Sequence, residues 1–181
     1  MRVRSLAPIA DANADVLVLG SMPGIASLRA QQYYAHPRNA FWRIVGELLG
    51  FDANASYTKR VKALKSARIA VWDVLESCVR DGSADAMIED DSLLANDFRT
   101  FFAAHTRIRR VFFNGTKAEA CYKRHVLRQI ESGPMVYSRL PSTSPANASV
   151  PFADKLGAWR AILSPQRTAA VRAPTLGALE P

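Results

Sequence analysis

Residues 15–24 read Asp-Val-Leu-Val-Leu-Gly-Ser-Met-Pro-Gly, and they decide the fold class. The apolar run over residues 16–19 has the pattern of a strand that is buried on both faces, as in a parallel sheet. A loop with glycines at both ends follows at once, and glycine allows a tight turn and a close approach of the backbone to a ligand. In open α/β sheets, ligands bind beyond the carboxyl ends of the strands. We therefore expect the functional site at this loop.

The rest of the chain alternates apolar strands with helical segments, which favours a layered α/β domain. We expect strands near residues 16–19, 69–75, 108–113 and 135–140, and helices over 39–49, 59–65, 93–105, 117–130 and 150–163. The polar stretch 77–91 is expected to be a loop. The stretch 141–147 is expected to hold neither helix nor strand, because it is rich in proline and small hydroxyl residues.

Length and composition indicate one ordinary globular unit. The 181 residues suffice for a single domain with a substantial core, which we place over residues 1–163, with a disordered tail over 164–181. No apolar run approaches the ~20 residues that cross a bilayer, and no secretory signal is recognisable. Cys78 and Cys121 lack metal-ligand spacing and are expected to be reduced core thiols. These features predict a cytoplasmic protein without a membrane segment.

The charge of the chain favours a polyanionic partner. Lysine and arginine number 24 against 16 aspartates and glutamates, which gives a formal net charge of +8. Each neutralised phosphate releases counterions and adds affinity, so this excess suits nucleic acid, although many basic proteins bind none. No cluster of His, Cys and Asp has the spacing of a metal site, and we expect neither a metal nor a cofactor.

Three of the expected strands end in loops of unusual composition, namely residues 20–24, Asn114-Gly115 and residues 141–147. Because the carboxyl ends of parallel strands meet at one edge of a sheet, we expect these loops to form one site. The segment Tyr-Tyr-Ala-His-Pro-Arg-Asn-Ala-Phe-Trp, residues 33–42, adds aromatic, basic and amide side chains next to the first loop.

Together these motifs resemble the uracil-DNA glycosylase superfamily, and most closely its hypoxanthine-DNA (deoxyinosine) glycosylase branch. They are Gly-Ser-Met-Pro-Gly (20–24), the segment 33–42, Phe-Asn-Gly-Thr-Lys (113–117) and Leu-Pro-Ser-Thr-Ser-Pro-Ala-Asn (140–147). The mismatch-specific uracil and thymine glycosylases are similar in the same places. The resemblance covers roughly residues 16–159. It implies a three-layer α/β/α sandwich around a central, mainly parallel four-stranded sheet.

The resemblance also implies a function. A monofunctional enzyme of this kind hydrolyses the N-glycosidic bond of a flipped, deaminated base in double-stranded DNA. Hypoxanthine is the expected base, and uracil or a mismatched base is the alternative. No lysine occupies a motif position suited to Schiff-base attack, so we expect an abasic site and no strand cleavage. We expect the protein to act as a monomer.

One departure from the relatives assigns the catalytic residue. The mismatch-specific enzymes carry an asparagine at the third position of the first loop, where it positions the attacking water. Here that position is Met22, which offers no donor and no strong acceptor. The resemblance to the hypoxanthine branch assigns the task to Asn39, although an asparagine there also suits the cap of the following helix.

The remaining site residues follow from the same resemblance. Tyr34 matches the aromatic side chain that stacks on the flipped base, with ordinary core packing as the alternative. We expect the other base contacts from Gly20, Ser21, Met22, Pro23 and Asn114, although Asn-Gly is also a common turn dipeptide. DNA contacts are expected from Ser142, Thr143, Ser144, Ala146 and Asn147, where Ala146 stands in place of the larger wedge residue of the relatives.

Several polar side chains leave two interpretations open. Arg38, Lys117 and Arg139 are candidates for phosphate contacts or ordinary surface residues. His36 is a candidate general acid or a residue that braces its loop. Asp81, Ser83 and Asp85 fit a solvated loop better than an acid–base or metal site.

Two functions of other classes compete with the glycosylase. The absence of an asparagine in the first loop keeps open a catalytically silent nucleic-acid-binding module on the same fold. A small-molecule hydrolase would use the 20–24 loop as an anion site at a helix N-terminus. The chain has no Gly-x-Ser-x-Gly motif and no Walker-type lysine, which counts against the hydrolase.

Overall fold

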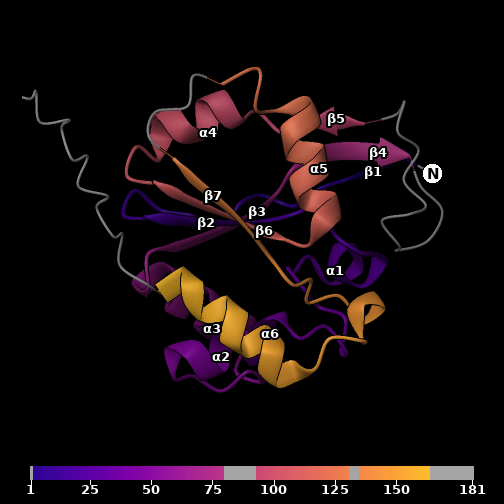
Figure 1. The fold of residues 1–181 in the computed structure, drawn as a ribbon, viewed down its shortest axis with the longest axis vertical. Coiled ribbons are helices and arrows are strands. Elements are labelled where there is room, and N and C mark those ends of the chain that lie inside the picture. Colours follow the sequence, from indigo (N-terminus) through magenta and orange to yellow (C-terminus); the bar gives the residue numbers. More distant parts are fainter. Residues whose placement is uncertain (1, 80–92, 131–134, 164–181) are drawn as a thin grey trace, which may run out of the picture.

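The computed structural model describes residues 2–79, 93–130 and 135–163. A four-stranded sheet, in the order β3-β2-β6-β7, forms the centre of the molecule (Figure 1). Its strands are β2 (Val16–Gly20), β3 (Ile69–Asp73), β6 (Arg110–Asn114) and β7 (Val136–Leu140). All three pairings are parallel and start in register, with Val16 opposite both Ile69 and Arg110. The predicted parallel sheet is confirmed, and its carboxyl ends lie at one edge.

Helices cover both faces of this sheet (Figure 1). One face carries α2 (Phe41–Leu49), α3 (Tyr57–Ser66) and α6 (Phe152–Trp159), and the other carries α4 (Phe98–Ala104) and α5 (Thr116–His125). A short helix, α1 (Ile25–Ala30), follows the first loop. This arrangement is the three-layer α/β/α sandwich that the family resemblance implies.

The apolar patterns of the sequence account for the residues that form the core. Every residue of β2 is buried, as its unbroken apolar run requires. Helix α2 turns Phe41, Ile44 and Val45 inward at helical spacing. It ends at Gly50, which has a φ of 73°, a left-handed conformation that glycine adopts without strain. Cys78 and Cys121 are buried and form no disulfide, as expected for core thiols.

A second, antiparallel sheet is absent from the sequence prediction. It consists of β1 (Arg2–Arg4), β4 (Leu75–Val79) and β5 (Leu94–Ala95), in the order β1-β4-β5. The predicted strand 69–75 is therefore wrong at its end, because β3 stops at Asp73 and the chain then joins the other sheet. Likewise, residues 77–79 are strand rather than loop. Pairing with β1, more than 70 residues away, stabilises β4, and local periodicity cannot reveal it.

Helix boundaries account for the other differences. The predicted helix 93–105 begins only at Phe98, because the Asp97 side chain accepts a hydrogen bond from the Thr100 N–H and caps it there. Helix α5 ends at His125 rather than near residue 130, and α6 gives way to a 3₁₀ turn, η4 (Arg160–Leu163). The stretch 141–147 is irregular except for one 3₁₀ turn, η3 (Pro145–Asn147).

Some predictions fall outside the described residues. These are the predicted tail 164–181 and the side chains of Asp81, Ser83 and Asp85. Among the helices that the structure does describe, none is long and apolar enough to cross a bilayer.

Candidate active site

A cavity of about 300 Å³ opens at the carboxyl edge of the sheet. It lies between the loop after β2, the segment before α2 and the loop after β7, so the three loops that the sequence groups together do line one space. The predicted residues that line it are Gly20, Ser21, Met22, Pro23, Tyr34, His36, Asn39, Asn114, Ser142, Thr143, Ser144 and Ala146. Asn147, predicted at the same site, is not part of this lining.

Asn39 lies at the wall of the cavity and at the start of α2. Its Oδ1 accepts a hydrogen bond of 3.0 Å from the Phe41 N–H, and its own N–H donates to the His36 carbonyl at 2.9 Å. The first bond satisfies one of the N–H groups that a helix start leaves unpaired. Capping uses one lone pair of the amide oxygen and leaves the Nδ2 donors for another partner. Asn39 thus supports the start of α2 from the residue before its N-cap, Ala40, and this support is compatible with a role in the cavity.

Tyr34 forms another part of the wall. Its ring stacks on Phe41 with centroids 4.0 Å apart and an interplanar angle of 26°. The backbone φ of Tyr34 is 53°, a left-handed conformation that costs free energy at a residue other than glycine. Such a conformation persists only where the surroundings hold it, and here the carbonyl of Tyr33 accepts a 2.8 Å hydrogen bond from Trp42 Nε1. The ring is thus fixed against α2.

Gly20, at the end of β2, lies against the buried carboxylate of Asp73, a residue that was not among the predicted site residues. Asp73, its register partner on β3, is only 2 % exposed, and its Oδ2 accepts a hydrogen bond of 3.1 Å from Ser5. A methyl group on Gly20 would overlap Asp73 Oδ1 and lie 3.3 Å from the Tyr34 hydroxyl. Glycine is therefore required here by packing. An aspartate that ends a buried apolar strand was the signal in the sequence.

The charge of Asp73 has an electrostatic consequence for Tyr33. Burial, followed by the negative charge of Asp73, raises the pKa of the Tyr33 phenol far above its ordinary range. The phenol therefore stays neutral, and it donates a hydrogen bond of 3.1 Å to the Leu6 carbonyl. Tyr33 is itself part of the cavity lining, and this hydrogen bond holds it in place.

The loop after β7 is pinned to its neighbours by Thr143. This residue is 1 % exposed, and both its hydroxyl and its N–H bond to the side chain of Asn114. Its carbonyl accepts a 3.0 Å hydrogen bond from the Ala40 N–H at the start of α2. Thr143 thus holds the loop to the end of β6 and to the start of α2, a role that the sequence did not predict. Because the hydroxyl and the N–H of Thr143 are used inside the protein, the predicted phosphate contacts of this loop fall to the residues next to Thr143.

Ser142 and Ser144 are those neighbours, and both are only half-buried. The Ser142 hydroxyl accepts a 3.2 Å bond from the Ser144 N–H, and the Ser144 hydroxyl accepts a 3.3 Å bond from the Ala146 N–H. A hydroxyl that accepts a bond still has its own O–H to donate. Ser142 also packs against Gly115, whose φ of 98° and 2.8 Å clearance for a Cβ admit only glycine.

The charged candidates differ in their surroundings. Arg38 is exposed beside the cavity, and its N–H donates to His36 Nδ1 at 3.2 Å, which fits the bracing interpretation of His36. Arg139 pairs with Glu119 at 3.2 Å, and Lys123 pairs with the same carboxylate at 2.8 Å. Lys117 lies in the first turn of α5.

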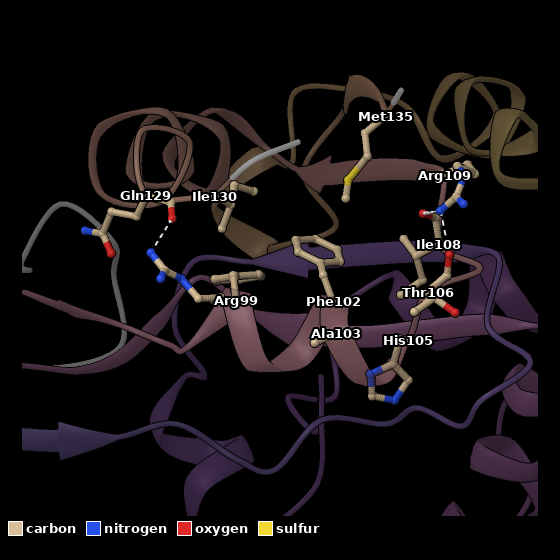
Figure 2. Close-up of a pocket in the computed structure, with 11 residues that line it drawn as sticks. Arg99, Phe102, Ala103, His105, Thr106, Ile108, Arg109, Gln129, Ile130 and Met135 are labelled. Atoms are coloured by element: carbon tan, nitrogen blue, oxygen red, sulfur yellow. Dashed lines mark hydrogen bonds between the residues drawn. The ribbon is translucent and has the colours of Figure 1, made fainter. Parts of the chain in front are cut away.

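A larger cavity of about 510 Å³ lies at the opposite, amino edge of the sheet (Figure 2). Its arginines are tied to backbone carbonyls: Arg99 donates to Gln129 at 3.1 Å, and Arg109 donates to Thr106 at 2.6 Å. None of the predicted site residues lines this cavity. Within residues 2–79, 93–130 and 135–163, no group of three or more His, Cys, Asp or Glu side chains is placed to hold a metal ion.

Comparisons with known proteins bear on this site. Two curated relatives are each named hypoxanthine DNA glycosylase. The one from Methanosarcina barkeri is 38% identical over 119 residues, which is 65% of this chain and 74% of the relative. The one from Methanosarcina acetivorans is 40% identical over 116 residues, which is 64% of this chain and 72% of the relative.

A solved structure and a family model match more of the chain than these two relatives do. The solution NMR structure of a Methanosarcina acetivorans protein described as a candidate uracil DNA glycosylase superposes with a TM-score of 0.73 at 35% identity. That match covers 90% of this chain and 99% of the other. The family model described as the uracil DNA glycosylase superfamily matches residues 7–163. The chain belongs to the uracil-DNA glycosylase superfamily.

Proposed function

We propose that the protein is a monofunctional DNA glycosylase that releases hypoxanthine from deaminated adenine sites and leaves an abasic site. The observation that carries this proposal is the cavity at the carboxyl edge, where an aromatic ring, an amide and a tight backbone loop meet in a chain of this superfamily. Two relatives at 38% and 40% identity are named for the same activity. The catalytic domain is proposed to span residues 1–163 and to act as a cytoplasmic monomer.

The chemistry needs a bound base, a leaving-group stabiliser and a placed water. Cleavage of the bond passes through an oxocarbenium-like sugar while negative charge grows on the departing base. Hypoxanthine carries acceptors at O6 and N7. The backbone N–H groups of Ser21 and Met22, two buried residues that line the cavity in the loop after β2, are proposed to donate to these acceptors. Donors fixed in advance stabilise the developing charge without reorganisation.

Asn39 is proposed to position the attacking water. The hydrogen bond between its Oδ1 and the Phe41 N–H holds the amide in one orientation at the cavity wall. Its Nδ2 donors then have a fixed direction, which is what water positioning requires. Tyr34, backed by Phe41 on one face, is proposed to stack on the base with its other face.

The 141–147 loop is proposed to contact the backbone of double-stranded DNA. Ser142 and Ser144 offer hydroxyl donors for phosphates, alongside backbone N–H groups. Ala146 is exposed but small, so it fills little of the gap that a flipped base leaves. A weak wedge favours bases that are already poorly paired, such as hypoxanthine opposite thymine.

A substrate panel tests the proposal. Labelled duplexes carry a single hypoxanthine, uracil or xanthine, and abasic sites are scored by strand scission in alkali. The proposal expects release from the hypoxanthine duplex, fastest opposite thymine. Preferential release of uracil would assign the enzyme to another specificity of the superfamily. Salt-sensitive binding without any release would instead support the silent binding module, whose motivating feature is Met22 in the first loop.

A further inference from the structure

Lys155 is buried on α6, directly behind the 141–147 loop. Its residue exposure is 5 %, and its Nζ donates a hydrogen bond of 2.7 Å to the carbonyl of Asn147. No carboxylate in the part of the chain that the structure describes forms an ion pair with it. Burial lowers the pKa of the ammonium, and no neighbouring charge opposes that effect. A single neutral carbonyl is thus the described partner of a buried cation.

The same helix holds the other end of the loop. Trp159, one turn further along α6 and fully buried, donates from Nε1 to the Pro141 carbonyl at 3.0 Å. Side chains four residues apart lie on one helix face, so Lys155 and Trp159 meet the two ends of the loop together. The two bonds anchor residues 141 and 147 to one rigid element.

A further hydrogen bond connects Asn147 to the wall of the cavity. Asn147 Nδ2 donates to the Ser142 carbonyl at 3.0 Å, so the residue that Lys155 holds also holds Ser142. Ser142 in turn lines the cavity and packs against Gly115 at the end of β6. Lys155 therefore acts on the cavity wall through Asn147, without lining the cavity itself.

Folding alone gives little reason for a lysine at this position. An ammonium that is partly withdrawn from water beside a neutral partner loses part of its hydration, whereas a methionine of similar length would bury the same stem at no such cost. The positive charge of Lys155 would instead favour the binding of an anionic ligand. A positive charge that is held next to the loop and partly shielded from water attracts phosphates bound by that loop with less screening than a fully exposed lysine has.

We propose that Lys155 is a positioning residue for DNA binding. It fixes the Asn147 end of the 141–147 loop, and its buried charge raises the affinity of that loop for the phosphodiester backbone. The inference rests on the proposed role of the loop in DNA binding.

Three substitutions distinguish the effect of the hydrogen bond from Lys155 to Asn147 from the effect of the positive charge of Lys155. Lys155→Met removes both, Lys155→Gln keeps an N–H donor without the charge, and Lys155→Arg keeps both. Lys62→Met, at an exposed position on α3 away from the cavity, is the control for loss of one positive charge. Each variant is measured for its Kd toward a duplex with a stable abasic-site analogue, its single-turnover rate on a hypoxanthine duplex, and its Tm.

The expected pattern is a loss of binding without a loss of fold. Lys155→Met raises the Kd about tenfold or more, while its Tm stays within about 4 °C of the wild type. Lys155→Arg restores the Kd to within about threefold, Lys155→Gln falls between, and Lys62→Met changes it less than about twofold. A purely structural lysine would not give a Kd that changes at constant Tm.

Two results would overturn the inference while leaving the enzyme assignment intact. One is a Kd for Lys155→Met equal to that of the wild type. The other is a large fall in Tm that accompanies the weaker binding and that Lys155→Arg does not repair. If the wild type itself neither binds the abasic duplex nor releases hypoxanthine, the proposed function fails together with the inference.

Discussion

Asn114 and Thr143 hold each other through two hydrogen bonds of 2.8 Å. Asn114 Nδ2 donates to the Thr143 hydroxyl, and the Thr143 N–H donates to Asn114 Oδ1. The pair ties the end of β6 to the loop after β7. Because Thr143 is also bound to the Ala40 N–H, the wall of the cavity is one connected structure.

This pairing predicts strong coupling in a double-mutant cycle. Asn114→Ala leaves the buried N–H of Thr143 without its acceptor and should cost about 1–3 kcal/mol of unfolding free energy. Thr143→Val removes only the hydroxyl. Urea denaturation of both single variants and the double variant should show an interaction energy of about 1 kcal/mol. Because valine keeps the backbone N–H, additive effects within about 0.3 kcal/mol would contradict the bond between Asn114 Nδ2 and the Thr143 hydroxyl.

The contact between Gly20 and Asp73 predicts a severe effect of one methyl group. In Gly20→Ala the new Cβ overlaps Asp73 Oδ1, and the cost should be about 1–3 kcal/mol, together with a displaced Tyr34 ring and slower base excision. Gly157→Ala is the matched control, since nothing lies within 4 Å of its added Cβ on α6. That change should stabilise the protein by about 0.5–1 kcal/mol. Equal thermal unfolding of both variants would refute the packing argument.

How much of this structure the sequence predicts depends on the range of the interactions. The buried run before Gly20 and the stop of α2 at Gly50 are local signals, and both are confirmed. The convergence of three loops follows from the parallel sheet, and it too is found. In contrast, β4 depends on a partner strand at the N-terminus, and its own residues carry no clear alternation.

Individual side chains in the site show the same limit. Thr143 was predicted to contact DNA, but its hydroxyl accepts a hydrogen bond from the side chain of Asn114, 29 residues away. Asp73 and Lys155 were not named as site residues. Their importance comes from burial beside a distant loop or strand, which composition and spacing do not report.

Substitutions at Tyr34 test whether its ring stacks on the flipped base. Tyr34→Phe keeps a ring on Phe41 and should retain the excision rate within about threefold, whereas Tyr34→Ala should lower it by about 10–100-fold. Single-turnover release of hypoxanthine at saturating enzyme separates the two. If Phe is as harmful as Ala, the hydroxyl rather than the ring carries the effect.

The buried ammonium of Lys155 predicts a pH dependence of stability. Burial lowers its pKa in the folded protein below the ordinary 10.5, so the unfolded chain keeps this proton to higher pH. Between the lowered pKa and about 10.5, the unfolded state binds more protons, and this contribution to stability rises with pH. Lys155→Met lacks this pH-dependent contribution to stability. The difference in unfolding free energy between wild type and variant, measured from pH 8 to about 10.5, should therefore shift in favour of the wild type. A difference that stays constant would show that Lys155 titrates normally.

The most direct test of the account is the role of Asn39, measured by single-turnover abasic-site formation on a duplex with one hypoxanthine. Asn39→Ala and Asn39→Ser are compared with the wild type, because serine also caps helices well and keeps that function alone. The account predicts release by the wild type and a fall of about a hundredfold or more in both variants, with the Tm of Asn39→Ser nearly unchanged. A rate restored by serine would reduce Asn39 to a helix cap, and a wild type that leaves hypoxanthine in place would contradict the proposed function itself.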